Sequence, residues 1–262
     1  MRYTADHDFH IHSTLSPCCH DKNQTPEAIL DYARENNLKA ICLTNHLWDE
    51  NVKSPAQWHE EQRFDWITSA LPLPQDENIR FLFGAEVDMD YENNIGISRE
   101  RMEMFDFLIF STTHLHLSGV TVKIPVSSPE EAARLWVERF WALLKNDLPK
   151  NKVGIAHLTC GHILKGQTVD VVKNIDENSM KQLFTASAEK GIGIELNMRA
   201  MSIAPEELDI LLKPYRIAKE CGCKFYLGSD SHKRSALKDA KENFEKIIDL
   251  LELTENDKFI VK

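Results

Sequence analysis

The sequence has no apolar run long enough to cross a membrane and no block of basic residues. Its 262 residues contain no window near the roughly 18 uninterrupted apolar residues that a membrane helix needs, and no leader-like apolar stretch in residues 1–13. Lysine and arginine total 31 against 41 acidic residues, a formal net charge of −10. Because such a protein repels phosphate backbones and anionic lipid, we expect neither a membrane nor a stable nucleic-acid partner. The missing leader and the cysteine usage predict a soluble cytoplasmic protein.

Cysteine is scarce as well. Six cysteines in a chain of this size, with no leader, do not suggest a disulfide framework, so we expect free thiols. Cys221 and Cys223 lack a second cysteine pair at zinc-finger spacing. Repeats, charge blocks and low-complexity linkers are also missing. With 42% hydrophobic residues, the chain has material for one domain over residues 1–262, and its oligomeric state cannot be predicted.

Short apolar segments alternate with longer segments of helical period. Seven of the short ones resemble strands buried on both faces of a parallel sheet: Asp8–Ile11, Ala40–Thr44, Arg80–Val87, Phe107–Thr112, Val153–Ala156, Gly193–Leu196 and Lys224–Leu227. Thr25 predicts a helix cap, Ser128 and Glu131 predict a capping box, and Pro214 predicts a helix break followed by a second short helix. This alternation predicts an α/β fold, and its length suits a closed barrel, with an open doubly wound sheet as the alternative.

Eleven histidines are the most unusual part of the composition. The candidate metal ligands follow the C-terminal ends of the predicted strands: His10, His12, His46, Glu86, His114, His157, Asp230 and His232. In a parallel barrel these ends share one mouth. Because His10 and His12 are two residues apart on a strand, both imidazoles face one side and can share an ion, and His20 in the next loop can reach back. Glu86 ends an apolar run, where a buried carboxylate needs a cation.

A lone histidine is more often a surface or hydrogen-bonded core residue than a metal ligand. A shared place at the strand ends favours the metal interpretation for the histidines above. His7, His59, His116 and His162 lack that support, and we interpret them as structural or surface residues. His116 lies two residues after His114 and can face the same mouth.

Seven motifs lie at the ends of the seven predicted strands, and all but Glu195-Leu196-Asn197 contain candidate ligands. The other six are Asp8-Phe9-His10-Ile11-His12, Leu43-Thr44-Asn45-His46, Gly84-Ala85-Glu86, Ser111-Thr112-Thr113-His114, Ile155-Ala156-His157 and Gly228-Ser229-Asp230-Ser231-His232. Their order, over nearly the whole chain, resembles the PHP (polymerase and histidinol phosphatase) family. Within that family the chain most resembles the histidinol-phosphatase-like phosphoesterases. Paired histidines alone also mark amidohydrolases, whereas the ordered set is more specific.

The resemblance implies a distorted TIM-like (βα)7 barrel that holds two to three divalent ions. It assigns the ligands of the three ions as His10, His12, Glu86 and Asp230; Glu86, His114 and His157; and His20, His46 and His232. The catalytic residues would be Glu86, Asp230 and His232. Imidazoles suit zinc, iron or manganese, and the carboxylates also permit manganese or magnesium, so the metal stays open. His20 is the hardest to place because residues 13–19 must first be threaded to the site.

The chain departs from the family pattern beside two ligands. Asn45 stands where an acidic residue usually precedes the second-strand histidine. The amide loses a charge but keeps the hydrogen-bonding capacity to orient a ligand. Leu158 follows His157 where a proline is frequent, and we expect this change to be harmless.

The expected chemistry follows from the ions. Closely spaced divalent ions acidify a shared water and neutralise phosphoryl oxygens, so no protein nucleophile is needed. The sequence therefore predicts a phosphoesterase for a small phosphomonoester, with histidinol phosphate one candidate and a nucleotide or sugar phosphate another. Because imidazoles bind metal only when neutral, activity should collapse below about pH 6.

Three residues are candidates for contact with the substrate. Arg199 is placed to clamp the phosphate through two hydrogen bonds, and a solvated surface arginine is an equally supported interpretation. Lys233, next to His232, is a weaker candidate. Trp48 is expected at the pocket rim, with ordinary packing as the alternative.

Two other functions stay open. The barrel can be a non-catalytic or regulatory PHP module of the kind fused to polymerases, although an intact ligand set is costly to keep without use. It can also be an amidohydrolase-like C–N hydrolase. That class leads us to expect a coordinating lysine after a middle strand, and we find none so placed.

Overall fold

The computed structural model describes residues 1–54, 56–197 and 204–261. The strands are β1 (His7–Ile11), β2 (Ala40–Leu43), β3 (His46–Leu47), β4 (Arg80–Asp88), β5 (Phe107–Ser111), β6 (Val153–Ile155), β7 (Gly193–Leu196) and β8 (Lys224–Leu227). The helices are α1 (Pro26–Glu35), α2 (Phe64–Thr68), α3 (Arg99–Met102), α4 (Pro129–Leu144), α5 (Thr168–Asn174), α6 (Glu177–Lys190), α7 (Pro205–Glu220), α8 (Arg234–Leu237) and α9 (Ala240–Leu250), with 3-10 turns at Gln57–Glu61 and Glu255–Asp257. Every predicted strand is present, with bounds within one residue of those expected.

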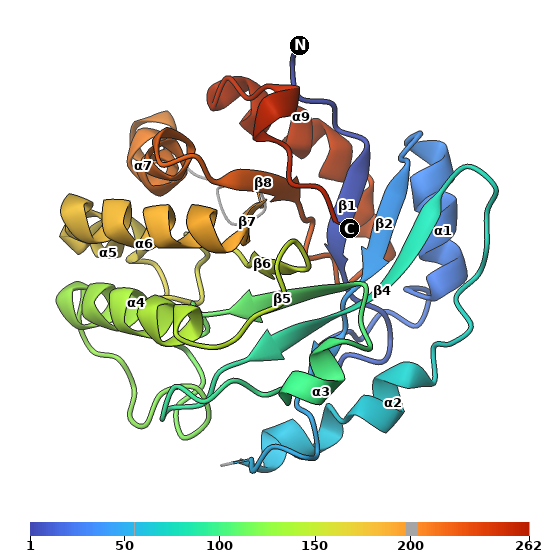
Figure 1. Cartoon of the computed structure of the whole chain (residues 1–262), viewed down its shortest axis with the longest axis horizontal. Helices are drawn as coiled ribbons and strands as arrows, with labels where there is room; N and C mark the ends of the chain where they lie inside the picture. The colour runs from blue at the N-terminus through green and yellow to red at the C-terminus, as the bar shows by residue number, and fades with distance from the viewer. Residues whose placement is uncertain (55, 198–203, 262) are drawn as a thin grey trace.

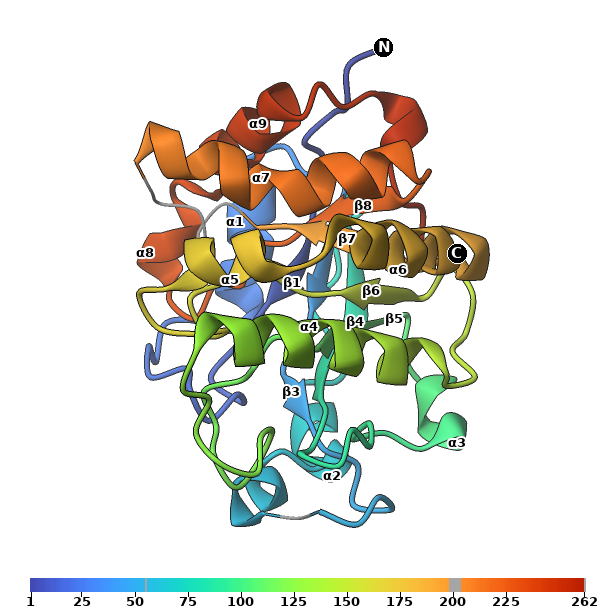
Figure 2. The ribbon, with the colours of Figure 1, turned by 90° about the vertical axis from the view of Figure 1, so that its left-hand side faces the viewer.

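The strands form one parallel sheet in the order β1-β2-β4-β5-β6-β7-β8, and β3 pairs with β4. Beyond β8 the chain joins the free edge of β1: the Asp230 N–H donates to the His10 carbonyl at 2.7 Å, and the His12 N–H donates to the Ser231 carbonyl at 3.0 Å. The sheet therefore curls into a distorted, nearly closed TIM-like (βα)7 barrel, and the open-sheet alternative is excluded. Figures 1 and 2 show the longer helices, among them α1, α4, α6, α7 and α9, on the outside.

A bulge in β1 lets one strand supply both core and site. The register of β1 against β2 shifts between Asp8 and Ile11. Phe9 packs against Phe107 in an apolar cluster with ring centroids 5.6 Å apart, while the next residue, His10, contacts Glu195 of β7. A bulge re-aims successive side chains in this way, and bulges are frequent beside functional sites.

The predicted helix starts are largely confirmed. The Ala28 N–H donates to Thr25 Oγ1 at 3.3 Å, and the Glu131 N–H donates to Ser128 Oγ at 3.2 Å. The Glu131 carboxylate accepts the Ser127 N–H, one residue earlier than a capping box requires.

The predicted break at Pro214 is absent. Helix α7 runs uninterrupted through Pro214, which is buried with Leu211, Leu212 and Tyr215. A proline inside a helix costs about 3 kcal/mol. Burying three large apolar side chains contributes about 1.5–3 kcal/mol each, which offsets that cost. Among the described residues, no helix has both the length and the apolar character needed to span a bilayer.

Candidate metal centre

The strand ends bring most of the predicted ligands together. Within the described ranges, three groups have candidate ligand atoms that all lie within 4.8 Å of one another: His10, His12, Glu86 and Asp230; Glu86, His114 and His157; and His12, His46 and His232. The first two groups contain the residues expected for two of the ions. The third contains His12 where His20 was expected.

His20 is exposed and belongs to none of these groups. Its loop instead contributes Ser16, whose Oγ accepts the His46 N–H at 3.2 Å. The structure therefore does not bring His20 together with His46 and His232.

A break between β2 and β3 places His46. Strand β2 ends at Leu43, and pairing resumes in β3 so that His46 lies beside Glu86 in parallel register. Asn45 sits in the break, and the Glu86 N–H donates to its carbonyl at 3.0 Å. The second strand thus contributes His46 to the site only through β3, which continues the chain beyond the break.

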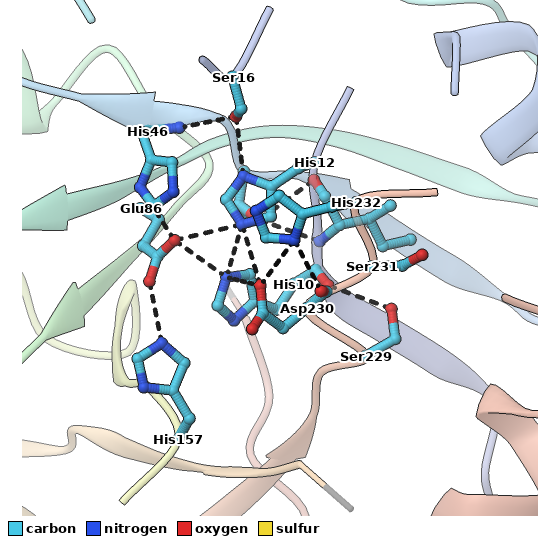
Figure 3. Close-up of polar contacts among 12 residues, drawn as sticks. His10, His12, Ser16, His46, Glu86, His157, Ser229, Asp230, Ser231 and His232 are labelled. Carbon is cyan, nitrogen blue, oxygen red and sulfur yellow. Dashed lines mark hydrogen bonds and ion pairs between the residues drawn. The ribbon is translucent and has the colours of Figure 1, made fainter. Parts of the chain in front are cut away.

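Glu86 is the centre of the cluster, as Figure 3 shows. Its Oε2 lies 3.3 Å from His10 Nε2, 3.2 Å from His12 Nε2 and 3.1 Å from His46 Nδ1. Its Oε1 lies 3.1 Å from His157 Nε2. One buried carboxylate therefore lies within 3.3 Å of four imidazoles, and His114 Nε2 lies 3.8 Å from its Oε1. Two of the groups share Glu86 through opposite oxygens.

Carboxylates anchor the far nitrogen of two of the imidazoles. His10 Nδ1 lies 3.0 and 3.1 Å from the two oxygens of Glu195, and His114 Nδ1 lies 2.7 Å from Asp88 Oδ1. Such partners fix the ring orientation and tautomer of a metal-binding histidine and raise its basicity. The free nitrogen is thereby left to face Glu86.

Hydroxyl groups anchor two more rings. His12 Nδ1 lies 2.8 Å from Ser16 Oγ, and His157 Nδ1 lies 2.8 Å from Thr113 Oγ1. The Ser16 hydroxyl donates to Asn45 Oδ1 at 2.9 Å, so its oxygen accepts the His12 Nδ1 proton. Asn45 thus orients His12 through Ser16, as its hydrogen-bonding capacity predicted.

These contacts bear directly on whether a cation fits. When both rings are neutral, with their Nδ1 protons donated elsewhere, His10 and His12 turn two Nε2 lone pairs toward each other at 3.0 Å, with Glu86 Oε2 within 3.3 Å of both. Electron-rich atoms so close repel unless a positive charge lies among them. Imidazole and carboxylate donors in this arrangement suit a transition-metal ion.

Burial and charge separate the pKa values of the histidines. Burial lowers the pKa of His46 to about 4, and burial together with His12 lowers that of His232 to about 3. Both rings are therefore neutral donors at physiological pH. For His10, burial lowers the pKa, but the negative charges of Glu195 and Glu86 overcome this and raise it well above 6.5.

The two carboxylates in the groups stay ionised. Burial alone raises the pKa of Glu86, but His46 and His10 outweigh this and hold it well below its usual range. Burial also raises the pKa of Asp230, and the charges of His10 and His232 with a hydrogen bond from His12 bring it far below its usual value. Negative charge is thus kept at the centre.

Two candidate ligands lie on strained backbone. Asp230 has φ of 50° and His157 has φ of 26°. Positive φ in a non-glycine residue costs about 1–3 kcal/mol and is most frequent at functional sites.

A pocket of about 360 Å³ opens beside the three groups. Its lining residues are Cys18, His157, Cys160, Gly161, His162, Asn197, Asp230 and His232. None of these described residues is lysine or arginine.

The expected substrate contacts have different outcomes. Trp48 is only 2% exposed and stacks on His59 with ring centroids 3.8 Å apart, so it packs in the core and does not line this pocket. An indole flanked on both sides by protein favours the packing alternative. Lys233 is exposed, next to His232. Arg199 lies outside the described residues.

Asp88 is a functional candidate that the sequence interpretation missed, and Glu195 was named there only within a motif, without a role. Glu195 interrupts the apolar β7, and Asp88 lies two residues after Glu86 on β4, so both carried the signal of a carboxylate on an inward-facing strand position. His116 and His162 also lie beside the site, both with rings packed against His114.

The fold and the site define a TIM-like barrel with a candidate centre for several metal ions. The PHP domain matches residues 8–199, most of the chain. The chain belongs to the PHP family.

Of three similar solved structures, the first shares the fold. A histidinol phosphate phosphatase from Lactococcus lactis, in complex with zinc, L-histidinol and phosphate, has a TM-score of 0.62 and 17% identity over 97% of this chain and 98% of that one. A probable 2-pyrone-4,6-dicarboxylic acid hydrolase from Acinetobacter baumannii reaches a TM-score of 0.44 and 13% identity over 97% of both chains. An ochratoxinase from A. niger reaches 0.40 and 11% over 95% and 67%. No curated protein matches the sequence.

Proposed function

We propose that this protein, as one domain, is a metal-dependent phosphoesterase that hydrolyses a small phosphomonoester. The observation that carries the proposal is the convergence of four imidazoles on Glu86, each within 3.3 Å of one of its oxygens. Membership of the PHP family and the fold shared with the Lactococcus phosphatase support the same activity.

The three groups would hold two to three divalent ions. His10, His12, Glu86 and Asp230 would hold one, and Glu86 would share a second with His114 and His157. A third would lie at His46 and His232, with His12 nearby and His20 as a further candidate. The histidine-rich set favours zinc, iron or manganese over magnesium.

The chain's own side chains orient this centre. Bound ions supply positive charge for phosphoryl oxygens and make water more acidic. Glu195 and Asp88 hold the rings of His10 and His114 in the orientation that ions need. Asp230 and His232 reach the pocket wall, so a substrate there would contact the centre from that side.

The pocket favours a small substrate. A volume of about 360 Å³ is near the lower end of ligand sites and suits a metabolite. Histidinol phosphate is a candidate because the Lactococcus phosphatase was solved with L-histidinol and phosphate. Arg199 and Lys233 remain the proposed contacts for the phosphate.

Metal analysis with a phosphatase assay tests the proposal. The purified protein should contain two to three ions and hydrolyse p-nitrophenyl phosphate, and chelation should abolish turnover until metal is restored. Glu86→Gln should lose both metal and turnover, whereas Glu92→Gln, at an exposed position after the same strand, should lose neither. A protein without bound metal and without chelator-sensitive turnover would refute the proposal.

A further inference from the structure

Two histidines outside the three groups lie together at the mouth of the pocket. His116 follows β5 and His162 follows β6, and both are exposed. Their ring centroids are 4.4 Å apart with 32° between the planes. His162 lines the same pocket as Asp230 and His232. Two loops therefore present a pair of accessible imidazoles beside the candidate centre.

The pair has the geometry of imidazoles that belong to one candidate metal group. Within the third group, the rings of His12 and His232 are 4.1 Å apart at 19°, and those of His12 and His46 are 4.7 Å apart at 36°. The His116–His162 pair falls between these two in both distance and angle.

We propose that His116 and His162 bind a further divalent ion, zinc in particular, at the pocket mouth. Neutral imidazoles are good ligands for zinc, which takes four ligands in total. Two positions would then be left for water or for a ligand oxygen. With only two protein ligands, this site binds more weakly than groups that also contain carboxylates.

The neighbouring histidine determines the order of filling. Both rings pack edge-on against His114, with centroids 5.5 Å away for His116 and 5.7 Å for His162. An ion on the pair would lie close to one held by His114, Glu86 and His157, and two dications repel each other at short range. The outer site therefore fills last, at higher free zinc.

Occupation of the outer site would obstruct the pocket. Because His162 belongs to the pocket wall, an ion there occupies part of the space open to a substrate. Excess zinc should thus inhibit turnover after the inner groups are filled. This consequence rests on the proposed function, whereas the binding site itself does not.

Counting bound zinc tests the site without any need for turnover. Equilibrium dialysis against increasing free zinc should show one more ion per chain in the unaltered protein than in the His116→Asn/His162→Asn double variant. Loss of an orienting partner alone costs about 10–100-fold in metal affinity, so loss of both ligands should cost at least about 100-fold. Lys165→Asn, an exposed change in the loop of His162, is the matched control and should keep the ion. Equal zinc counts in the double variant and the unaltered protein would overturn the site.

Inhibition by zinc tests the role. The rate of p-nitrophenyl phosphate hydrolysis is measured against zinc concentration and expressed relative to the maximal rate of each protein. The zinc concentration that halves this rate should be at least about tenfold higher for the double variant than for the unaltered protein or Lys165→Asn. Identical inhibition curves, despite one fewer bound ion, would overturn the obstruction of the pocket. A protein with no turnover would refute the proposed phosphatase but leave the zinc count decisive for the site.

Discussion

Glu195 connects two of the candidate metal groups. Its carboxylate contacts the His10 ring and also accepts the His157 backbone N–H at 3.0 Å, so it touches one member of each group. A Cβ at Gly228 would collide with this carboxylate, which explains the glycine there. The buried Glu195 carboxylate thus lies among residues from β1 and from the segments after β6 and β8.

Replacing Glu195 should weaken metal binding without removing a ligand. Glu195→Gln keeps the shape but loses the charge that makes His10 basic, and we expect metal affinity to fall about 10–100-fold. Competition with a chromophoric chelator measures the change. Glu189→Gln, at an exposed position of helix α6, is the control and should match the unaltered protein. An unchanged affinity for Glu195→Gln would contradict this role.

Metal affinity should depend on pH above neutrality. In the metal-free protein the carboxylates raise the pKa of His10 well above 6.5 despite burial, so His10 still holds a proton near neutral pH. A metal must displace that proton, so affinity falls as pH decreases and rises as pH increases through the raised pKa. Chelator competition from about pH 6 to about pH 8 should show affinity still increasing at the upper end. A constant affinity over that range would exclude proton competition at His10.

For individual residues, the sequence predicts a site position only where the spacing along the chain indicates which way a side chain faces. His10 and His12 follow from the period of a strand, and Glu86 from a charge that ends an apolar run. Contacts between distant loops carry no such signal, so the association of His116 with His162 and the stacking of Trp48 on His59 were not predictable. His20 shows the same limit, because loop conformation decides where it points.

Helix α4 organises the loops after β4 and β5 through Arg139. Its guanidinium, only 1% exposed, donates to the carbonyls of Thr112 at 2.9 Å, Asp90 at 2.9 Å, Thr121 at 2.7 Å and Met89 at 3.0 Å. Burial lowers the pKa of Arg139 to about 10, which leaves it charged at neutral pH. The first of these loops follows directly on β4, which contains Glu86, and the second, after β5, contains His114.

Arg139→Lys should be strongly destabilising. One ammonium group cannot reproduce four hydrogen bonds of this geometry, and each buried carbonyl left unpaired costs about 1–3 kcal/mol. We expect the free energy of unfolding to fall by about 3 kcal/mol or more in urea titrations. Arg134→Lys, on the same helix with 63% of its side chain exposed, should change it by less than about 0.5 kcal/mol. Equal stabilities for the two variants would show that the carbonyl contacts contribute little.

At the scale of elements, strands are more predictable than helix continuity. Strands buried on both faces of a parallel sheet are mostly apolar, so all seven were recognisable. The two-residue β3 was missed because it is too short for a pattern and exists only through its pairing with Glu86 and Val87. The uninterrupted α7 depends on burial of the face around Pro214, which local propensity does not contain.

For the whole molecule, metal should act as a stabilising ligand. An ion that binds only the folded barrel at about 1,000 times its Kd adds about 4 kcal/mol, which corresponds to roughly 8–16 °C in Tm for a protein of this size. Chelation should lower Tm by that order, and added zinc should restore it. In scanning calorimetry, Glu86→Gln should show a much smaller chelator effect, and equal shifts in both proteins would place the stabilising metal elsewhere.

The joint between β1 and the segment after β8 has a consequence for biosynthesis. His10 and His12 are synthesised some 220 residues before Asp230 and His232. During translation His10 and His12 therefore lack the contacts of the segment after β8, and the barrel cannot close until that segment leaves the ribosome. Contacts so distant in sequence form slowly. An ion could accordingly be held by all four residues of this group only after the chain has been extended past Asp230.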